Sequence, residues 1–118
     1  MADGNALDGV VVLDLTRVLA GPLCAQMLGD MGADVIKVEH PGRGDDTRHW
    51  GPPFADTEAA YFLGVNRNKK SLALDFKSPA GLQVLKKLVQ KSDIVIDNFK
   101  PGLLDKLGLT SDWFKTEA

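Results

Sequence analysis

Polar and cationic side chains that could bind an anion come directly after the short apolar runs of this chain. In chain order they are Thr16, Arg17, Glu39, His40, Lys77, Asp97 and Asn98. Arginine and lysine suit phosphate and carboxylate groups because they form charge-assisted hydrogen bonds with them. If the apolar runs are parallel strands, these residues share one edge of a sheet, where open α/β sheets bind ligands. The pattern therefore favours an anionic ligand.

A dense basic cluster, NRNKK at 66–70, is a second candidate anion site. A solvated turn is the other interpretation of this cluster, and the residue types alone favour the turn. The loop after the first apolar run holds a single glycine, Gly21, where a dinucleotide fingerprint has three, and no P-loop occurs. The sequence therefore argues against the common binding modes of NAD and ATP.

Residues of the types used in catalysis show no catalytic arrangement. The lone cysteine, Cys24, falls on the expected apolar face of a helix, where a small buried side chain is the usual role. Asp45 and Asp46 lie in a turn, which favours solvated or helix-capping roles. His49 has no visible catalytic partner. We therefore assign no catalytic residue and no metal ligand.

The composition is that of an ordinary globular protein. The length of 118 residues is enough for one domain with a modest core. The residues are 44% apolar and 25% charged, which is usual for a globular protein. A net charge of -2 argues against a general nucleic-acid binder. The amino terminus lacks the apolar segment of a signal peptide, and no run approaches the ~20 apolar residues of a membrane span. We expect a cytoplasmic protein without nucleic-acid or membrane partners, and no mitochondrial or peroxisomal import signal is visible.

Strand and helix patterns alternate along the chain and would position these polar residues. Strands are expected at 10–15, 35–38, 70–76 and 94–96. Helices are expected at about 22–31, 57–65, from 79 onward, at 102–107 and from 111 to the end. The stretch 39–57 is expected to be a long loop of the kind that is usually functional. The alternation predicts an α/β fold with a Rossmann-like, mostly parallel open sheet and flanking helices.

Six motifs, in order, resemble the family III CoA-transferases of the CaiB/BaiF type. They are LDG at 7–9, DLTRVLAGP at 14–22, GADVIKVE at 32–39, GDDTR at 44–48, NRNKKSLALD at 66–75 and NFKPG at 98–102. The resemblance implies that residues 1–118 form a single amino-terminal CoA-binding domain, incomplete relative to the family. It further implies transfer of CoA from an acyl-CoA to a carboxylic acid, and an interlocked homodimer in the intact enzyme.

The resemblance also implies which residues contact CoA. The first loop matches the family segment near the thiol end of CoA, and His40 matches a position near the adenosine end. The implied contacts are Arg17, Val18, Leu19, Ala20, His40, Leu74, Asp75, Phe76, Lys77, Asn98, Phe99 and Lys106. CoA and acyl-CoA are implied as substrates, and neither a metal nor a covalently bound cofactor is implied.

Two features of the resemblance bear on activity. The family's nucleophilic aspartate lies beyond the position of Ala118, which implies that this chain alone has no turnover. Leu19 stands where formyl-CoA members carry glutamine, and the segment at 44–54 is most similar to members that act on succinyl-CoA or other dicarboxyl-CoA. The racemase branch is less favoured because its connection before the NKKS segment is shorter. The alternative from another class is a non-catalytic CoA- or nucleotide-binding or assembly module.

Overall fold

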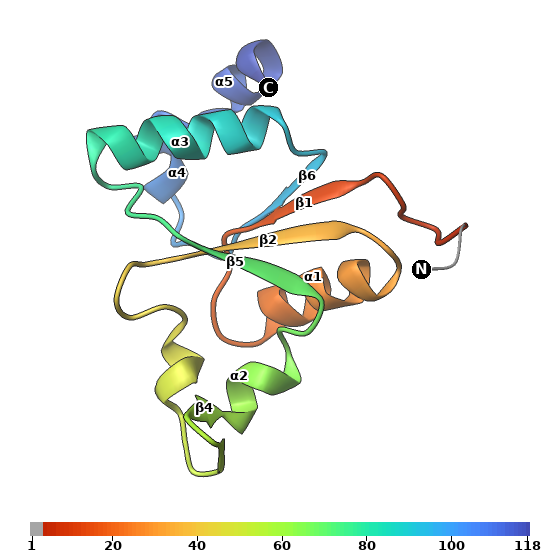
Figure 1. Ribbon diagram of the computed structural model, residues 1–118. Helices are drawn as coiled ribbons and strands as arrows, with labels where there is room; N and C mark the ends of the chain where they lie inside the picture. Colours follow the sequence, from red (N-terminus) through yellow and green to blue (C-terminus); the bar gives the residue numbers. More distant parts are fainter. Residues whose placement is uncertain (1–3) are drawn as a thin grey trace.

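Four parallel strands form the centre of the computed structural model, which describes residues 4–118 (Figure 1). In chain order the strands are β1 (Val11–Asp14), β2 (Asp34–Glu39), β5 (Lys69–Ala73) and β6 (Ile94–Ile96). Their spatial order is β5-β2-β1-β6, so the chain moves outward from β1 to β5 and then returns to place β6 on the other side of β1. The predicted parallel α/β sheet is confirmed. Residues 1–3 of the predicted domain lie outside the described residues.

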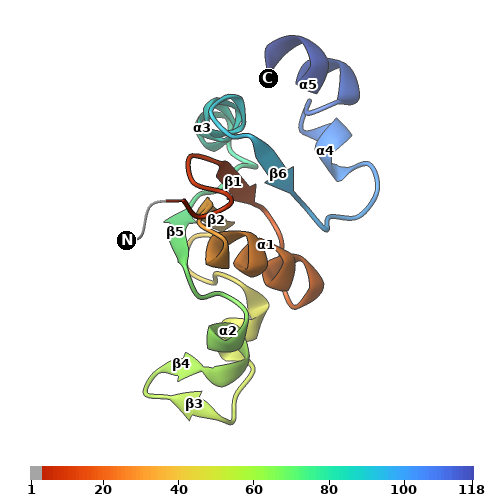
Figure 2. The same cartoon turned by 90° about the vertical axis from the view of Figure 1, so that its right-hand side faces the viewer.

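Helices cover both faces of this sheet. The helices are α1 (Ala20–Asp30), α2 (Ala60–Gly64), α3 (Pro79–Gln90), α4 (Leu103–Lys106) and α5 (Ser111–Glu117), and the two that cover the faces are α1 and α3. Figure 2 shows the sheet nearly edge-on, with α1 on one face and α3 on the other. None of the helices in the described part of the chain is long and apolar enough to cross a bilayer.

Helix α3 illustrates how the sequence determines an element. The Ser78 side chain accepts a hydrogen bond from the backbone N–H of Gly81 at 3.1 Å, and Pro79 occupies the first helical position. Both are strong signals for a helix start. Leu85 and Val89 follow at helical spacing and are buried on the sheet. This face of the sheet carries the larger apolar core, whose buried members are Leu13, Leu15, Val38, Leu85, Val89 and Leu109.

The sheet-facing side of α1 differs from the prediction. Pro22, Ala25 and Gln26 are buried in α1, whereas Cys24 is exposed, so the expected burial of the cysteine is wrong. Gly21 explains the orientation of the helix, because a Cβ at this position would lie 2.3 Å from the side chain of Thr16. An apolar stripe could not reveal this close approach, since α1 carries apolar residues on every side.

The long segment after β2 contains more regular structure than predicted. It forms a 3₁₀ helix, η1 (Asp46–His49), and a short antiparallel hairpin of β3 (Phe54–Ala55) and β4 (Glu58–Ala59). The predicted helix at 57–65 begins later, at Ala60, because β4 precedes it. Together with α2 these elements form a lobe beyond the sheet, drawn at the bottom of Figure 1. Trp50 and Tyr61 pack edge to face there, with ring centroids 5.3 Å apart.

We expect Leu85→Ala to lower the free energy of unfolding by about 2–5 kcal/mol, because it leaves a cavity beneath α3. Val84→Ala is the matched control. Val84 is the neighbouring residue in α3 and is 44% exposed, so this variant should lose little unfolding free energy. Urea unfolding followed by circular dichroism measures both. Equal losses in the two variants would contradict the packing of α3 on the sheet.

Candidate functional site

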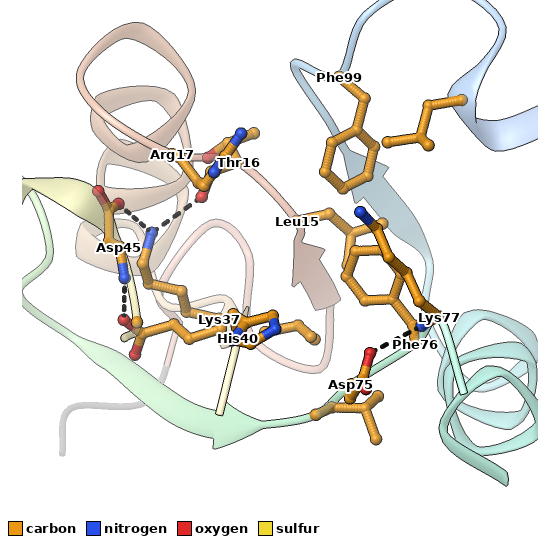
Figure 3. A pocket seen from close by; sticks show the side chains of 15 residues that line it. Leu15, Thr16, Arg17, Lys37, His40, Asp45, Asp75, Phe76, Lys77 and Phe99 are labelled. Atoms are coloured by element: carbon orange, nitrogen blue, oxygen red, sulfur yellow. Dashed lines mark hydrogen bonds and ion pairs between the residues drawn. The ribbon is translucent and has the colours of Figure 1, made fainter. Parts of the chain in front are cut away.

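A pocket of about 150 Å³ opens at the carboxyl edge of the sheet (Figure 3). Its walls come from the end of β2 and from the segments that follow each of the four strands. The lining residues are Leu15, Thr16, Arg17, Lys37, Val38, Glu39, His40, Gly44, Asp45, Leu74, Asp75, Phe76, Lys77, Phe99 and Leu103. Strand order reverses between β1 and β6, and ligands of open α/β sheets bind at such a switch point.

The pocket brings together many of the residues that the resemblance assigns to CoA. Those that line it are Arg17, His40, Leu74, Asp75, Phe76, Lys77 and Phe99. Those that do not line it are Val18, Leu19, Ala20, Asn98 and Lys106. Val18, Leu19 and Ala20 lead from the loop after β1 into α1, and Lys106 is exposed at the end of α4. The pocket is therefore one part of the surface outlined by the predicted contacts.

One side of the pocket is aromatic. The rings of Phe76 and Phe99 are tilted against each other with centroids 5.7 Å apart, and both also pack on the apolar core under α3. Figure 3 shows them across the pocket from Asp45, with the Lys77 side chain close by. An apolar wall with cations at its rim suits a ligand that has both apolar and anionic groups.

A hydrogen bond to the backbone defines which ring nitrogen of His40 carries the proton. Its Nδ1 lies 2.8 Å from the backbone oxygen of Pro41, and Nδ1 carries the proton because a carbonyl oxygen only accepts. In the neutral ring, Nε2 is then the acceptor. The exposed imidazole can stack on a planar group or exchange a hydrogen bond with one.

The opposite side of the pocket is built on a buried ion pair. The Lys37 ammonium lies 3.0 Å from a carboxylate oxygen of Asp45, and their side chains are 2% and 0% exposed. Lys37 also donates to the backbone oxygen of Thr16 at 3.0 Å. Burial alone raises the pKa of Asp45, but hydrogen bonds from Thr47 and Lys37 and the Lys37 charge together hold it below its usual value.

The predicted roles of Asp45 and Asp46 are partly confirmed. Asp45 caps η1, because its side chain accepts from the backbone N–H of Thr47 at 3.0 Å, but the solvated alternative is wrong for Asp45 since Lys37 holds it in the interior. Asp46 remains partly exposed, and its oxygens lie 3.8 Å from Arg17 and 4.0 Å from Arg43.

A second charged cluster lies next to this pair. Arg48 donates to both carboxylate oxygens of Glu39, at 2.7 and 2.8 Å, and the backbone N–H of Asp45 donates to the same carboxylate at 2.9 Å. The hydroxyl of Ser71 donates to it as well. Burial alone raises the pKa of Glu39, but these hydrogen bonds and the Arg48 charge outweigh it and lower the pKa to about 2.

The basic cluster at 66–70 is used within the chain. Lys69 is buried against Asp14 at 2.9 Å, Arg67 pairs with Asp30 at 2.6 Å, and Lys70 pairs with Asp34 at 3.1 Å. None of the cluster's residues lines the pocket. Arg67 and Asn68 lie in an exposed turn, as the turn interpretation expects, whereas the Lys69 side chain is buried. The ion pairs with aspartates of the same chain do not support an anion site at this cluster. Burial lowers the pKa of Lys69, and Asp14 opposes this shift.

Residues 7–116 match the sequence profile of CoA-transferase family III. The chain belongs to this family. Within residues 4–118, no group of three or more histidine, cysteine or acidic side chains is arranged to hold a metal ion.

Several known members are similar to this family III chain. Succinyl-CoA:glutarate CoA-transferase from Mus musculus is 58% identical over 103 residues, which cover 87% of this chain and 24% of that protein. Formyl-CoA:oxalate CoA-transferase from Bradyrhizobium sp. is 47% identical over 114 residues, which cover 97% of this chain and 26% of that protein. A crystal structure of a CAIB/BAIF family protein from Brucella suis superposes with a TM-score of 0.87 at 50% identity. The superposition covers 94% of this chain and 30% of that one. The chain spans about a quarter of the length of these curated relatives.

The buried charges of this family III chain were not predicted as structural groups. The signal was present in β2, where Lys37 and Glu39 alternate with apolar residues at a spacing of two. Side chains two apart in a strand share a face, and the same face carries the buried Val35. A charge on a buried face needs a partner, and the GDDTR motif a few residues later supplies Asp45 and Arg48.

The low pKa of Glu39 predicts that it contributes to acid unfolding. A carboxyl whose pKa falls from 4.5 to about 2 on folding stabilises the protein above pH 4.5, and this stability is lost as the pH falls towards 2. The contribution is on the order of 3 kcal/mol. We expect Glu39→Gln to flatten the dependence of unfolding free energy on pH in this range.

Glu58→Gln is the matched control, because Glu58 also pairs with Arg48, at 3.3 Å, but its side chain is 44% exposed. Urea unfolding between pH 2 and pH 7 measures wild type and both variants. Parallel curves for wild type and Glu39→Gln would contradict the role of Glu39.

Lys37→Met should cost about 3–5 kcal/mol of unfolding free energy, because it leaves the Asp45 carboxylate buried without its cation. The double variant Lys37→Met/Asp45→Asn should recover part of this loss, since no buried charge remains. Lys70→Met is the control, because its ion pair with Asp34 is exposed and is worth about 0–1 kcal/mol. Thermal and urea unfolding measure all three, and a double variant less stable than Lys37→Met would contradict the explanation.

Proposed function

We propose that residues 1–118 form the CoA-binding domain of an enzyme that moves CoA between an acyl-CoA and a carboxylic acid. The observation that supports this most is the pocket at the carboxyl edge of the sheet. It gathers Arg17, His40, Lys77 and Phe99 from the segments after four different strands. The named relatives are CoA-transferases, and this chain spans about a quarter of their length, so we assign it the binding share of the reaction.

A pocket of about 150 Å³ is too small for the whole of CoA, so it would hold one portion of the cofactor. The aromatic wall of Phe76 and Phe99 suits a ring or an apolar arm. Lys77 and His40 at the rim would meet phosphate charge or stack on the base. Lys106 on α4 would give a further phosphate contact outside the pocket, and the loop containing Leu19 would lie along the thiol end.

The chemistry needs a nucleophile that we place beyond Ala118. In the proposed reaction a carboxylate oxygen of that aspartate attacks the thioester carbonyl, the C–S bond breaks, and CoA leaves as a thiolate. The thiolate then attacks the resulting anhydride to give an enzyme thioester and release the first acid. Asp14 and Asp45, the buried aspartates near the pocket, are bound to Lys69 and Lys37, which supports a binding role for this chain without turnover of its own.

For the acyl group we propose a dicarboxylic acid such as a succinyl or glutaryl chain. The mouse relative named for succinyl-CoA and glutarate is 58% identical, against 47% for the relative named for formyl-CoA and oxalate. Leu19 supports the same choice, because an exposed apolar side chain stands where formyl members carry glutamine. We further propose that the intact protein is a homodimer, as the family resemblance implies.

Calorimetric titration of the purified chain with CoA tests the proposal. We expect saturable binding that Lys77→Ala weakens about tenfold or more, because the variant removes a cation facing phosphate. Lys91→Ala is the control, since it removes an exposed lysine at the end of α3 that does not line the pocket. A folded chain that binds ATP or NAD as well as it binds CoA would contradict CoA recognition, and no binding at all would contradict a site held by this chain alone.

A further inference from the structure

The loop after β1 is held in an unfavourable backbone conformation. Val18 has a φ of 78°, in the left-handed region that β-branched residues rarely adopt. The adjacent Thr16 and Arg17 form part of the pocket wall. A strained conformation persists only where surrounding groups hold it in place, so its anchors are informative.

Three side chains from other parts of the chain anchor this loop. The side-chain amide of Asn98 donates to the backbone oxygen of Arg17 at 2.8 Å, and its oxygen accepts from the Arg17 N–H at 3.2 Å. The Asp45 carboxylate accepts from the backbone N–H of Val18, at 3.3 Å to each oxygen. Lys37 donates to the Thr16 oxygen at 3.0 Å. Consecutive peptide groups of the loop are thus bound from β2, from the segment after it and from the segment after β6.

Asn98 is placed to hold the loop and not to line the pocket. Both ends of its amide bind the backbone of Arg17, and Asn98 is absent from the pocket wall. Its two hydrogen bonds join the segments after β1 and β6, the neighbouring parallel strands between which the order of connection reverses. Loss of these bonds would let the two segments move apart and would release Arg17 from the wall.

We propose that Asn98 and the Lys37–Asp45 ion pair are positioning residues that keep the loop at Thr16–Leu19 in its strained form and so maintain the ligand-binding shape of the pocket. The proposal rests on the proposed CoA-binding function and deepens it. It replaces, for Asn98, the direct CoA contact that the family resemblance implies. The side chain acts through Arg17 and Val18.

Backbone amide exchange in the ligand-free protein tests the anchors directly. We expect Asn98→Ala to increase hydrogen exchange at Arg17 and Val18 about tenfold, because local opening of the loop becomes more frequent and both amides are hydrogen-bonded in the wild type. The melting temperature should change little, since Asn98 is exposed. Gln83→Ala is the control: it removes an exposed amide side chain on α3 and should leave exchange in the loop unchanged. Unchanged exchange in Asn98→Ala would overturn the proposal.

A coupling experiment with Val18→Gly links the anchors to binding. Glycine adopts a positive φ without strain, so the loop needs its anchors less in this background. We expect Asn98→Ala to weaken CoA binding about tenfold in the wild-type background and about threefold or less in Val18→Gly, as measured by calorimetry. A direct contact between Asn98 and CoA would give the same loss in both backgrounds, and that result would overturn the proposal.

The two measurements separate this proposal from the proposed function. If the wild-type chain does not bind CoA, the proposed function of the isolated chain fails, and the exchange data still decide whether Asn98 holds the loop. If the wild type binds CoA and exchange in the loop is unaffected by Asn98→Ala, the CoA site stands and the positioning role of Asn98 is wrong.

Discussion

The ion pair between Lys37 and Asp45 is the interaction on which the rest of the site depends. A buried ammonium is tolerated only where it is paired and hydrogen-bonded, and here Asp45 supplies the opposite charge and the Thr16 carbonyl a second acceptor. The partners come from different parts of the chain, so satisfying one charge fixes two loops. β2 carries the lysine, and the segments after β1 and β2 close on it to form one side of the pocket.

The same requirement connects the sheet to the lobe formed by η1, β3, β4 and α2. Glu39 extends from the end of β2 to Arg48 in η1, and the Arg48 guanidinium lies 3.8 Å from the centre of the Phe62 ring in α2. Among the described residues, no buried side-chain nitrogen or oxygen lacks a hydrogen-bond partner. The two faces of the sheet therefore differ in role. The face under α3 is apolar and supplies hydrophobic stabilisation, whereas the carboxyl half of the other face uses paired charges to position the loops.

Apolar runs and turn residues predicted the four strands, their parallel arrangement and the position of the pocket, because these depend on local sequence patterns. Features that depend on tertiary contacts were predicted wrongly. Cys24 is exposed because Gly21 lets α1 approach Thr16 closely, a contact between an element and a loop that no helical stripe encodes. The cations at 66–70 looked available for an anion, yet they bind Asp14, Asp30 and Asp34, which come from the segments around β1, α1 and β2. Charge type can be read from sequence, but the partner of each charge is set by the fold.

Burial divides the charges around the pocket into fixed and exchangeable groups. Lys37, Glu39 and Asp45 are buried, and releasing any of them would leave an unpaired charge in the interior, so they cannot turn to a ligand. Arg17 differs, since its side chain is 58% exposed and lies 3.8 Å from Asp46, an ion pair worth about 0–1 kcal/mol. Lys77 is also exposed and forms no ion pair within the described residues. An anion could therefore bind the rim cations at a small cost in lost ion pairs, while the buried charges keep the pocket wall in place.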